Sequence, residues 1–447
     1  MLNQNSARGA SPTTVAVIGS GISGLSCAYR LAQAGWDVTL YEANDYFGGH
    51  THTVDVTLDG ITHGVDTGFL VYNERTYPEL VKLFDELKVQ SVATDMSFSV
   101  KLPLEKRMLE WAGASLDTVF AQRRNLLSPR FIRMLRDILR FNAQATRIAR
   151  DGSSTAAQSL GAFLDQHRYS EEFRDWYLLP MAGCIWSCPT AQMLAFPLLT
   201  FVRFCDNHGL LQVNDRPQWR TVIGGARQYV DKLLAAIPHR HLNTPVKSVT
   251  RITSGARPQI RILTADRASF HDHVVLAGHS DQSLAMLKDA SAEERAVLGA
   301  IRYQPNRAIL HTDTSLLPRK LKAWSAWNYQ SEHGIEPRVC VHYLMNQLQP
   351  LPFRKTVIVS LNPIHAPRPD TILQEFKYAH PVFDAAAIDA QGKLAGLQGR
   401  ANTWFAGAWT GYGFHEDGLK SGLAVARAMN ARTTANLPSR FPLDQAA

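Results

Sequence analysis

The chain is poor in cysteine, and its few thiols form no pattern. Its 447 residues contain five cysteines, Cys27, Cys184, Cys188, Cys205 and Cys340. Such an odd and sparse set excludes a disulfide framework and favours a reducing compartment. Cys184 and Cys188 lie close together, but no second cysteine or histidine pair has matching spacing. The sequence therefore favours two packed thiols over a zinc site.

Long apolar runs are missing as well. No stretch of about 18 apolar residues occurs, so we expect no membrane-spanning helix. The polar N-terminus lacks the apolar segment of a secretory signal, and we expect disordered tails at 1–13 and 436–447. These absences predict a cytoplasmic protein and leave peripheral contact with a membrane open.

The signatures of several protein classes are also absent. The sequence has no internal repeat, serine triad, paired-carboxylate motif or metal-ligand cluster. Hydrophobic residues make up 45% and charged residues 19%, which is typical of a globular protein. The net charge of +8 is compatible with an anionic membrane, an acidic substrate or nucleic acid. Nucleic acid is not expected, because no recognised binding module accompanies the charge.

What the sequence does contain begins near its N-terminus. Residues 15–18 predict a buried strand, 24–34 a helix that ends at Gly35, and 38–41 a second strand. A G-x-G-x-x-G motif joins the first strand to the helix: Gly19, Ser20, Gly21, Ile22, Ser23 and Gly24. Glu42 and Ala43 follow the second strand. This order predicts a dinucleotide-binding β-α-β unit.

Each part of this motif has a physical role. Gly19 permits the tight turn, Gly21 lets the backbone approach a pyrophosphate, and Gly24 allows the helix to pack closely on the strand. The helix N-terminus offers free N–H groups and the positive end of its dipole to the phosphates. Glu42 is placed to accept hydrogen bonds from ribose hydroxyls.

A second glycine pair indicates FAD rather than NAD. Gly48 and Gly49, followed by His50 and Thr51, come shortly after the acidic residue, where an NAD site needs no glycines. This arrangement resembles the N-terminal motif of the superfamily of flavin amine oxidases, protoporphyrinogen oxidases and phytoene desaturases. The resemblance implies non-covalently bound FAD, with the glycine pair near its phosphates and ribityl chain. In that superfamily an arginine usually follows the pair, whereas this chain has His50.

The C-terminal region resembles the same superfamily. After a predicted strand, the matching positions are Gly407, Ala408, Gly418, Leu419 and Gly422. The resemblance implies a helix whose N-terminus points at the pyrimidine end of the flavin and stabilises negative charge on the reduced ring. This chain departs from the pattern twice. Ala408 stands where an acidic residue is usual, and the spacing from Gly418 to Gly422 is one residue shorter than is common.

The resemblance extends through the middle of the chain. Residues 246–252 resemble the strand that touches the adenine, with Val246 as the contact, and 222–229 resemble the turn and helix before it. The runs GGHTHT, DTGFLVYN, DMSFSV, WNYQ and GYGFHEDGLKSG are similar to a bacterial group of predicted NAD/FAD-binding proteins. Members of that group are often encoded beside methyltransferases resembling cyclopropane fatty acid synthase. This association implies a role in modifying fatty acyl chains.

Together these matches predict an α/β fold. We expect a discontinuous Rossmann-type (glutathione reductase-like) FAD domain with an inserted α+β substrate domain that contains a helical subdomain. The predicted segments are FAD parts at 14–75, 216–288 and 396–435, a mostly helical cap at 76–215 and a substrate-domain sheet at 289–395. Helices are predicted at 76–90, 114–125, 129–150, 156–166, 170–180, 225–237 and 419–431. Strands are predicted at 246–252, 259–263, 273–277, 339–343, 356–361 and 403–406.

The candidate catalytic residues flank the C-terminal helix. Tyr412, His415 and Lys420 are the side chains that the resemblance places near the flavin ring. His415 could exchange a proton near neutral pH, and a structural histidine in a tight loop is an equally good interpretation. Glu416 and Asp417 are better explained as helix caps than as reactive groups. The Asp66–Gly68 segment either lies near the flavin or forms an ordinary turn.

Histidine pairs and aromatic residues offer weaker signals. Three histidine pairs have the alternate spacing that places both rings on one strand face: His50 with His52, His239 with His241, and His271 with His273. Because no third ligand accompanies them, no metal is expected. Trp324, Trp327 and Tyr329 could either wall a substrate cavity or pack in a core.

The segment 130–150 predicts a basic amphipathic helix. Its arginines, at 130, 133, 136, 140, 147 and 150, fall on one face. The apolar residues fall mostly on the opposite face: Phe131, Met134, Leu135, Ile138, Leu139 and Phe141. The simpler interpretation is a solvated surface helix. The alternative is a helix that lies on anionic lipid.

Three functions compete. The leading hypothesis is an FAD-dependent oxidoreductase, a desaturase or dehydrogenase that passes a hydride from an apolar fatty acyl lipid substrate to flavin N5. The first alternative is a flavin amine oxidase that uses oxygen. The second is a non-catalytic flavin-binding partner protein, against which the long region between the cofactor segments argues. Oxygen, quinone and a partner protein all stay open as electron acceptors, and the oligomeric state stays open too.

Overall fold

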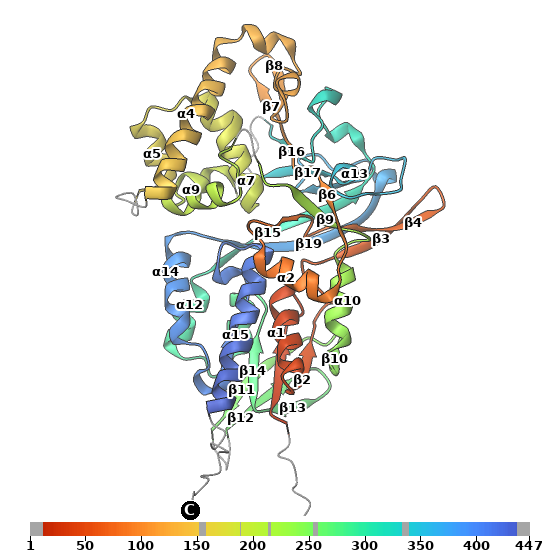
Figure 1. Ribbon diagram of the computed structural model, residues 1–447, viewed down its shortest axis with the longest axis vertical. Helices are drawn as coiled ribbons and strands as arrows, with labels where there is room; N and C mark the ends of the chain where they lie inside the picture. Colours follow the sequence, from red (N-terminus) through yellow and green to blue (C-terminus); the bar gives the residue numbers. More distant parts are fainter. Residues whose placement is uncertain are drawn as a thin grey trace, which may run out of the picture. The chain divides into compact units, whose positions relative to one another are not determined.

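The computed structural model describes residues 12–151, 158–187, 189–212, 216–253, 258–332 and 339–435. The chain divides into two compact units (Figure 1). Unit 1 consists of Met1–Gly49, Val230–Gly299 and Gln391–Ala447, and unit 2 of His50–Tyr229 and Ala300–Ala390. The predicted tails, apart from residues 12 and 13, lie outside the described residues, as does Cys188. The other four cysteines are buried, and none of these four forms a disulfide.

Unit 1 is built on a five-stranded parallel sheet with the order β10-β2-β1-β14-β20. Its strands are β1 (Thr14–Ile18), β2 (Asp37–Tyr41), β10 (His239–His241), β14 (His273–Leu276) and β20 (Thr403–Phe405). The central strands are buried on both faces, which explains why their sequences are nearly continuous apolar runs. This sheet, with its glycine-rich turn after β1, confirms the predicted Rossmann-type α/β fold.

Two helices, α1 (Ile22–Gln33) and α15 (His415–Ala435), pack side by side in unit 1 (Figure 1). A Cβ added at Gly422 would lie 2.1 Å from the Ser23 carbonyl oxygen. The two helices therefore touch through backbone, as only glycine permits. The remaining elements of unit 1 include β11 (Ser248–Ile252), β12 (Gln259–Leu263), β13 (Ala268–His271), α11 (Ser280–Met286), α12 (Ala292–Gly299) and η8 (Ala408–Thr410). Helices α10 (Arg227–Ala235) and α14 (Ala385–Lys393) cross the boundaries between the units.

Unit 2 contains a seven-stranded sheet with the order β19-β15-β18-β17-β16-β7-β8. Its strands are β7 (Phe98–Leu104), β8 (Arg107–Ala112), β15 (Arg302–His311), β16 (Trp327–Gln330), β17 (Cys340–Leu344), β18 (Ile358–Leu361) and β19 (Ile372–Val382). Smaller pieces are the hairpin of β3 (Thr53–Leu58) and β4 (Ile61–Asp66), and a sheet of β5 (Tyr72–Asn73), β9 (Trp219–Val222) and β6 (Ser91–Thr94). Trp327 and Tyr329 pack in the core of this unit, which supports the packing interpretation of these aromatics.

The helices of unit 2 are α2 (Pro78–Leu87), α3 (Leu116–Val119), η1 (Arg123–Leu127), α4 (Pro129–Asp151), α5 (Leu160–Gln166), α6 (Glu171–Phe173), α7 (Leu179–Trp186), α8 (Thr190–Leu194), α9 (Leu198–Asn207), η4 (Leu321–Ala323) and α13 (Met345–Leu348). A π-helical turn, η2 (Arg174–Leu178), joins α6 to α7 just before Pro180. Proline lacks the N–H that a regular α-helix would use there, which accounts for the widened turn. No helix of the described ranges is long and apolar enough to cross a bilayer.

Two secondary-structure predictions in the cap were wrong. Residues 107–112, within the region predicted as mostly helical, form β8, because they pair with β7 across a two-residue turn. The helix predicted at 114–125 is replaced by the short elements α3 and η1. Tertiary pairing overrides local helix propensity here. Leu139, predicted on the apolar face of α4, is 59% exposed.

Four predicted domain boundaries also differ from the observed units. Residues 50–75 and 216–229 group with unit 2, and residues 289–299 and 391–395 with unit 1. The first two segments belong together because β9 pairs with both β5 and β6. The glycine pair ends the first cofactor segment, and the sequence after it gives no sign that the chain leaves unit 1 there.

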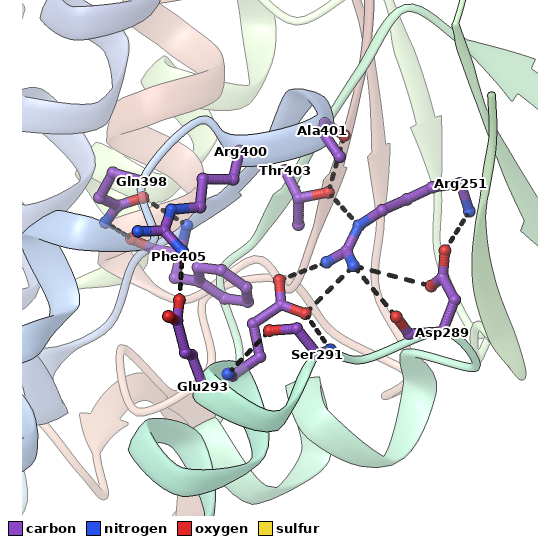
Figure 2. Close-up of polar contacts among 10 residues, drawn as sticks. Arg251, Asp289, Ser291, Glu293, Gln398, Arg400, Ala401, Thr403 and Phe405 are labelled. Atoms are coloured by element: carbon purple, nitrogen blue, oxygen red, sulfur yellow. Dashed lines mark hydrogen bonds and ion pairs between the residues drawn. The ribbon is translucent and has the colours of Figure 1, made fainter.

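A polar cluster in unit 1 fastens β20 to β11 and α12 (Figure 2). The Arg251 guanidinium donates to both carboxylate oxygens of Glu294, at 2.5 and 3.1 Å, and to Thr403 Oγ1 at 2.9 Å. Glu294 and Ser291 form a reciprocal cap on α12. The neighbouring Glu293 pairs with Arg400 at the surface, where both side chains are more than half exposed.

These adjacent acids give a matched test of the cluster. We expect Glu294→Ala to lower the free energy of unfolding by roughly 3–5 kcal/mol, because the largely buried Arg251 loses its bidentate partner and keeps only the more distant Asp289 carboxylate, at 3.8 Å. We expect Glu293→Ala to change it by about 1 kcal/mol or less, since exposed pairs contribute little. Thermal and urea unfolding of both variants measures the difference. Equal losses would show that the buried pair has no special role.

Candidate cofactor site

The turn after β1 brings the predicted phosphate-binding residues together. Gly19 has a φ of +101°, which favours glycine, and Gly21 is the N-cap of α1 with no side-chain cap. A Cβ added at Gly21 would meet no atom within 4 Å, so this backbone borders open space. At Gly24 an added Cβ would lie 1.9 Å from the Gly19 carbonyl oxygen. Gly19 and Gly21 thus shape the turn, and Gly24 lets α1 pack closely against it.

Glu42 and the second glycine pair converge on the same turn. Glu42 Oε2 accepts from Ser20 N at 2.9 Å and from Ser20 Oγ at 2.5 Å. Ser20 Oγ in turn accepts from Gly48 N at 3.1 Å. Gly48 forms a parallel bridge with Gly21, and an added Cβ at Gly49 would lie 3.0 Å from Gly21 Cα. The role of Ser20 as the link between these segments is not evident from the sequence motif.

This geometry fits the adenosine and pyrophosphate parts of FAD. Open space lies beside Gly21, and the first turn of α1 carries N–H groups without a side-chain cap. A phosphate binds such a helix end without further help. The Glu42 carboxylate is buried, and its two oxygens retain acceptor capacity for ribose hydroxyls. Val246 precedes β11, and its contact with adenine stays a prediction.

The C-terminal arm is held by contacts that the sequence did not reveal. Gly407 N donates to Ser421 Oγ at 3.1 Å, and Gln391 Nε2 donates to the carbonyls of Trp409 and Gly411, both at 2.7 Å. A Cβ at Gly407 would lie 2.2 Å from the Trp409 indole nitrogen. Glycine is therefore required there for packing. Ala408, which replaces the usual acid, begins η8.

The predicted catalytic residues lie around the start of α15. Burial lowers the pKa of His415 to about 3, so its imidazole is neutral at pH 7 and does not titrate near neutrality as expected. Lys420 is half exposed and lies 3.4 Å from the Glu416 carboxylate. Asp417 accepts from Tyr412 N at 3.1 Å and Phe414 N at 3.0 Å, which supports its interpretation as a cap. The proximity of these side chains to the flavin ring stays a prediction.

His50 and Thr51 belong to unit 2. The His50 ring lies 5.0 Å from the Tyr378 ring and 5.2 Å from the His380 ring. The Thr51 hydroxyl hydrogen-bonds to the Tyr229 hydroxyl at 3.1 Å. An imidazole can donate a single N–H to a phosphate but cannot make the bidentate contact of an arginine. The cofactor contact of His50 and Thr51 stays a prediction.

The Asp66–Gly68 segment forms a buried joint in unit 2 rather than an ordinary turn. The Asp66 carboxylate accepts hydrogen bonds from Thr53 Oγ1 at 2.5 Å, Ala226 N at 2.9 Å and Gln349 Nε2 at 2.8 Å. Burial raises the pKa of Asp66 to about 7, and these donors oppose the shift. Thr67 Oγ1 lies 2.8 Å from the Tyr378 hydroxyl. Through these hydrogen bonds, Asp66 joins β3 and β4 to the start of α10 and to α13.

The histidine pairs do not gather in a ligand set. His239 lies 3.3 Å from Asp37, and His241 contacts Arg267. In the part of the chain that the structure describes, no three histidine, cysteine, aspartate or glutamate side chains lie together as metal ligands.

Three curated proteins are similar to parts of the chain. A probable flavin-containing monoamine oxidase A of Dictyostelium discoideum is 24% identical over 250 residues, 53% of this chain and 51% of that protein. The 4,4'-diaponeurosporene oxygenase of Staphylococcus aureus is 31% identical over 144 residues, 31% of this chain and 27% of that protein. The polyenoic fatty acid isomerase of Ptilota filicina is 34% identical over 108 residues, 23% of this chain and 21% of that protein. The matches thus span about half of these relatives' lengths or less.

Solved structures share the whole fold. The cyclohexylamine oxidase of Brevibacterium oxydans superposes with a TM-score of 0.68 at 16% identity, and 95% of this chain covers all of that one. The fatty acid isomerase of P. acnes that produces CLA superposes with a TM-score of 0.62 at 17% identity, over 95% of this chain and 98% of that one. At such low identity these likenesses show the fold alone.

Substitutions at two glycines of the turn test cofactor binding and folding separately. We expect Gly21→Ala to unfold like the parent in the FAD-free form and to bind FAD at least about tenfold more weakly, because its methyl group enters the open space beside the turn. We expect Gly24→Ala to destabilise the FAD-free protein itself by overpacking, roughly 1–3 kcal/mol. Flavin titration and thermal unfolding of FAD-free protein measure both. The assignment of the open space to FAD fails if Gly21→Ala retains full affinity.

The buried Asp66 predicts a pH dependence of stability. Its folded pKa lies above the unfolded value of about 3.9, so its stabilising contribution is complete below pH 4 and is lost as pH rises through 7. Between pH 4 and 8 we expect the parent to lose roughly 2–4 kcal/mol relative to Asp66→Asn. Asp55 is the control: its pKa is lowered, first by its hydrogen bond with Arg227, so Asp55→Asn should show no such trend. Parallel curves for Asp66→Asn and the parent would contradict the raised pKa.

The family model of flavin containing amine oxidoreductases matches residues 22–352, about three quarters of the chain. The match runs from the first turn of α1 through most of unit 2. It agrees with the parallel sheet, the glycine-lined turn and the open space that fits FAD. The chain belongs to the flavin containing amine oxidoreductase family.

Proposed function

We propose that this enzyme acts on an apolar fatty acyl substrate as a desaturase or dehydrogenase. The observation that carries the proposal is an apolar pocket of about 160 Å³ within unit 2. Its apolar lining comes from α7, the α8 region and the end of β19: Trp186, Met193, Ala195, Phe196, Pro381, Val382 and Phe383. Aromatic and aliphatic walls of this kind favour a hydrocarbon chain.

A single ion pair accompanies this lining. Arg302 Nη2 lies 2.7 Å from Asp384 Oδ2, and the arginine side chain is 71% exposed, which places the pair at the solvent side of the pocket. A carboxylate-headed ligand could take the place of Asp384 on the guanidinium. The volume is below the roughly 300–1,000 Å³ of sites that enclose a whole drug-sized ligand. The pocket therefore suits a segment of an extended chain.

The lysines argue against the alternative of an amine oxidase with an active-site lysine. Twelve of the thirteen lysines are exposed, and all thirteen lie within the described ranges. Lys101 alone is partly buried, and its ammonium group donates to the carbonyls of Leu316 and Leu317, at 3.1 and 3.2 Å. These hydrogen bonds give Lys101, which lies on β7, a structural role.

The curated relatives include proteins named for fatty acids and proteins named for amines. The Ptilota filicina relative is named for polyenoic fatty acids, and the Dictyostelium discoideum relative for monoamines. The first match is more identical and shorter, and the second is longer and weaker. Because neither decides the substrate, the proposal depends on the pocket and on the lysines.

Desaturation sets requirements that this chain's residues can be tested against. Forming a carbon–carbon double bond removes one hydride and one proton from neighbouring carbons. FAD, when bound, supplies the hydride acceptor at N5. The proton needs a base, and His415 is a candidate because it lies at the start of α15 with a neutral imidazole. Its lowered pKa also makes this imidazole a weaker base than a solvated histidine. Lys420, held near Glu416 at the surface, is a weaker candidate.

An anaerobic substrate screen tests the proposal. We expect unsaturated or saturated long-chain fatty acyl compounds to bleach the flavin absorbance of the holoenzyme, and primary amines to leave it unchanged. Loss of flavin absorbance reports reduction of the flavin by the substrate, and this step does not depend on the electron acceptor that later reoxidises the flavin. Bleaching by amines and not by acyl compounds would reject the proposal in favour of an amine oxidase.

A bulky substitution tests the pocket itself. We expect Ala195→Trp, which fills part of the pocket, to weaken binding of a long-chain fatty acid about tenfold or more, since burial of several methylene groups is lost. Ala143→Trp on the exposed face of α4 is the control and should have no effect. Fatty acid titration monitored by flavin absorbance measures both. Equal affinities would place the acyl chain elsewhere.

A further inference from the structure

Apolar side chains gather on one part of the surface of unit 2. The four most exposed large hydrophobic residues of the described ranges are Leu127 at 89%, Leu116 at 78%, Leu321 at 72% and Leu139 at 59%. Leu126 and Ile132 are 51% and 45% exposed. Six of the eleven exposed large hydrophobics thus come from α3, η1, α4 and η4. We call these six residues the leucine patch.

The elements that carry the leucine patch adjoin one another. The Asp117 carboxylate of α3 pairs with Arg123 of η1 and, at 2.9 Å, with Lys322 of η4. Element η1 packs against α4, and η4 packs against both α3 and β8. The backbone N–H groups of Arg319 and Lys320 donate to the buried Glu110 carboxylate of β8, at 2.8 and 3.1 Å. The leucines therefore stand on a framework fixed by polar contacts beneath them.

Arginines are frequent on two of the segments that carry the patch, η1 and α4. Residues 122–140 contain six arginines and one acidic residue, Asp137, which is buried. On α4, Ile132 and Leu139 share an exposed stripe with Arg136, while Phe131, Met134 and Phe141 fill the core side. Acidic side chains offset part of this charge. Glu172 lies 2.6 Å from Arg130 and 3.8 Å from Arg133, Asp137 lies 3.3 Å from Arg140, and Asp117 pairs with Arg123. No ion pair of Arg136 occurs among the described residues.

We propose that the leucine patch docks on the surface of an anionic phospholipid bilayer. Exposed leucines beside the arginines of η1 and α4 match both parts of such a surface, because acyl chains accept the leucines and lipid phosphates accept the guanidinium groups. A second copy of the chain fits less well, since it would bring the same positive charge to the interface. This inference concerns where the enzyme works and does not depend on the proposed substrate.

The simpler interpretation of the basic helix is thereby revised. A solvated surface helix explains the arginines, but it does not explain why the most exposed apolar side chains of the described protein collect beside them. The predicted amphipathic face is also different from the observed one, because the docking residues come mostly from α3, η1 and η4. Only Ile132 and Leu139 come from α4 itself.

Vesicle co-sedimentation of the holoenzyme tests the proposal. We expect binding to vesicles of phosphatidylcholine with about 30% phosphatidylglycerol to be at least tenfold tighter than binding to phosphatidylcholine alone, and to weaken with added salt. The double variant Leu127→Ser/Leu321→Ser should bind about tenfold or more weakly. Arg136→Glu should lose binding only to the anionic vesicles.

Matched controls come from other exposed positions. Ile61→Ser at the start of β4 removes an apolar side chain that is 45% exposed, and Arg295→Glu reverses an exposed charge on α12. Both should bind vesicles like the parent, and flavin absorbance with thermal unfolding verifies that every variant is folded. No binding to anionic vesicles would overturn the proposal. Binding that the leucine substitutions leave unchanged would overturn the docking role of the patch. Dimers in sedimentation velocity that the leucine substitutions dissociate, without vesicle binding, would assign the patch to a second copy.

Discussion

Close contact between backbone segments is the constraint on which unit 1 depends. The β1–α1 turn, the second glycine pair and α15 meet at distances that leave no room for a Cβ, as at Gly24, Gly49 and Gly422. Gly21 differs from these three, because open space rather than protein lies beside it. The fold thus uses most of its motif glycines to bring three chain segments together, and leaves one free for a ligand. Binding and packing share one motif but depend on different residues within it.

This constraint explains why unit 1 was predictable from sequence. A position where packing excludes a side chain requires glycine, so such glycines recur at fixed spacings in the sequence. The glycine motifs at both ends of the chain therefore predicted the fold and the cofactor. The contacts that hold these segments were not predictable. Ser20, Ser421 and Gln391 are common residues whose roles arise only when distant segments meet. The ion pair of Arg251 with Glu294 is of the same kind, since its partners lie 43 positions apart.

Unit 2 was less predictable, because its structure depends on tertiary pairing rather than local pattern. Strand β8 lies within the region predicted as mostly helical, and its pairing with β7, which in turn pairs with β16, makes it part of a sheet. The leucine patch was missed for a related reason. Apolar periodicity was assumed to mean burial, yet Leu139 follows the pattern and remains exposed. Periodicity identifies a helix but does not show what covers each of its faces.

A buried hydrogen-bond chain shows how the sheet of unit 2 specifies its own register. Asp313 N donates to His311 Nδ1 at 3.0 Å, so the proton of His311 is on Nε2, which lies 2.6 Å from Ser360 Oγ. The Ser360 hydroxyl can then donate to His342 Nδ1 at 2.6 Å, which leaves the His342 proton on Nε2, 2.9 Å from Gln330 Oε1.

This hydrogen-bond chain runs in one direction, from His311 to Gln330, and requires both imidazole rings to be neutral. Burial lowers the pKa of His311 to about 4 and that of His342 to about 3, so each ring carries the single proton that the chain requires. The residues lie on β15, β18, β17 and β16, which are successive neighbours in the sheet. A one-residue slip of β18 would turn Ser360 to the other face and leave two buried imidazoles unsatisfied. The polar chain therefore excludes neighbouring registers that apolar packing alone would tolerate.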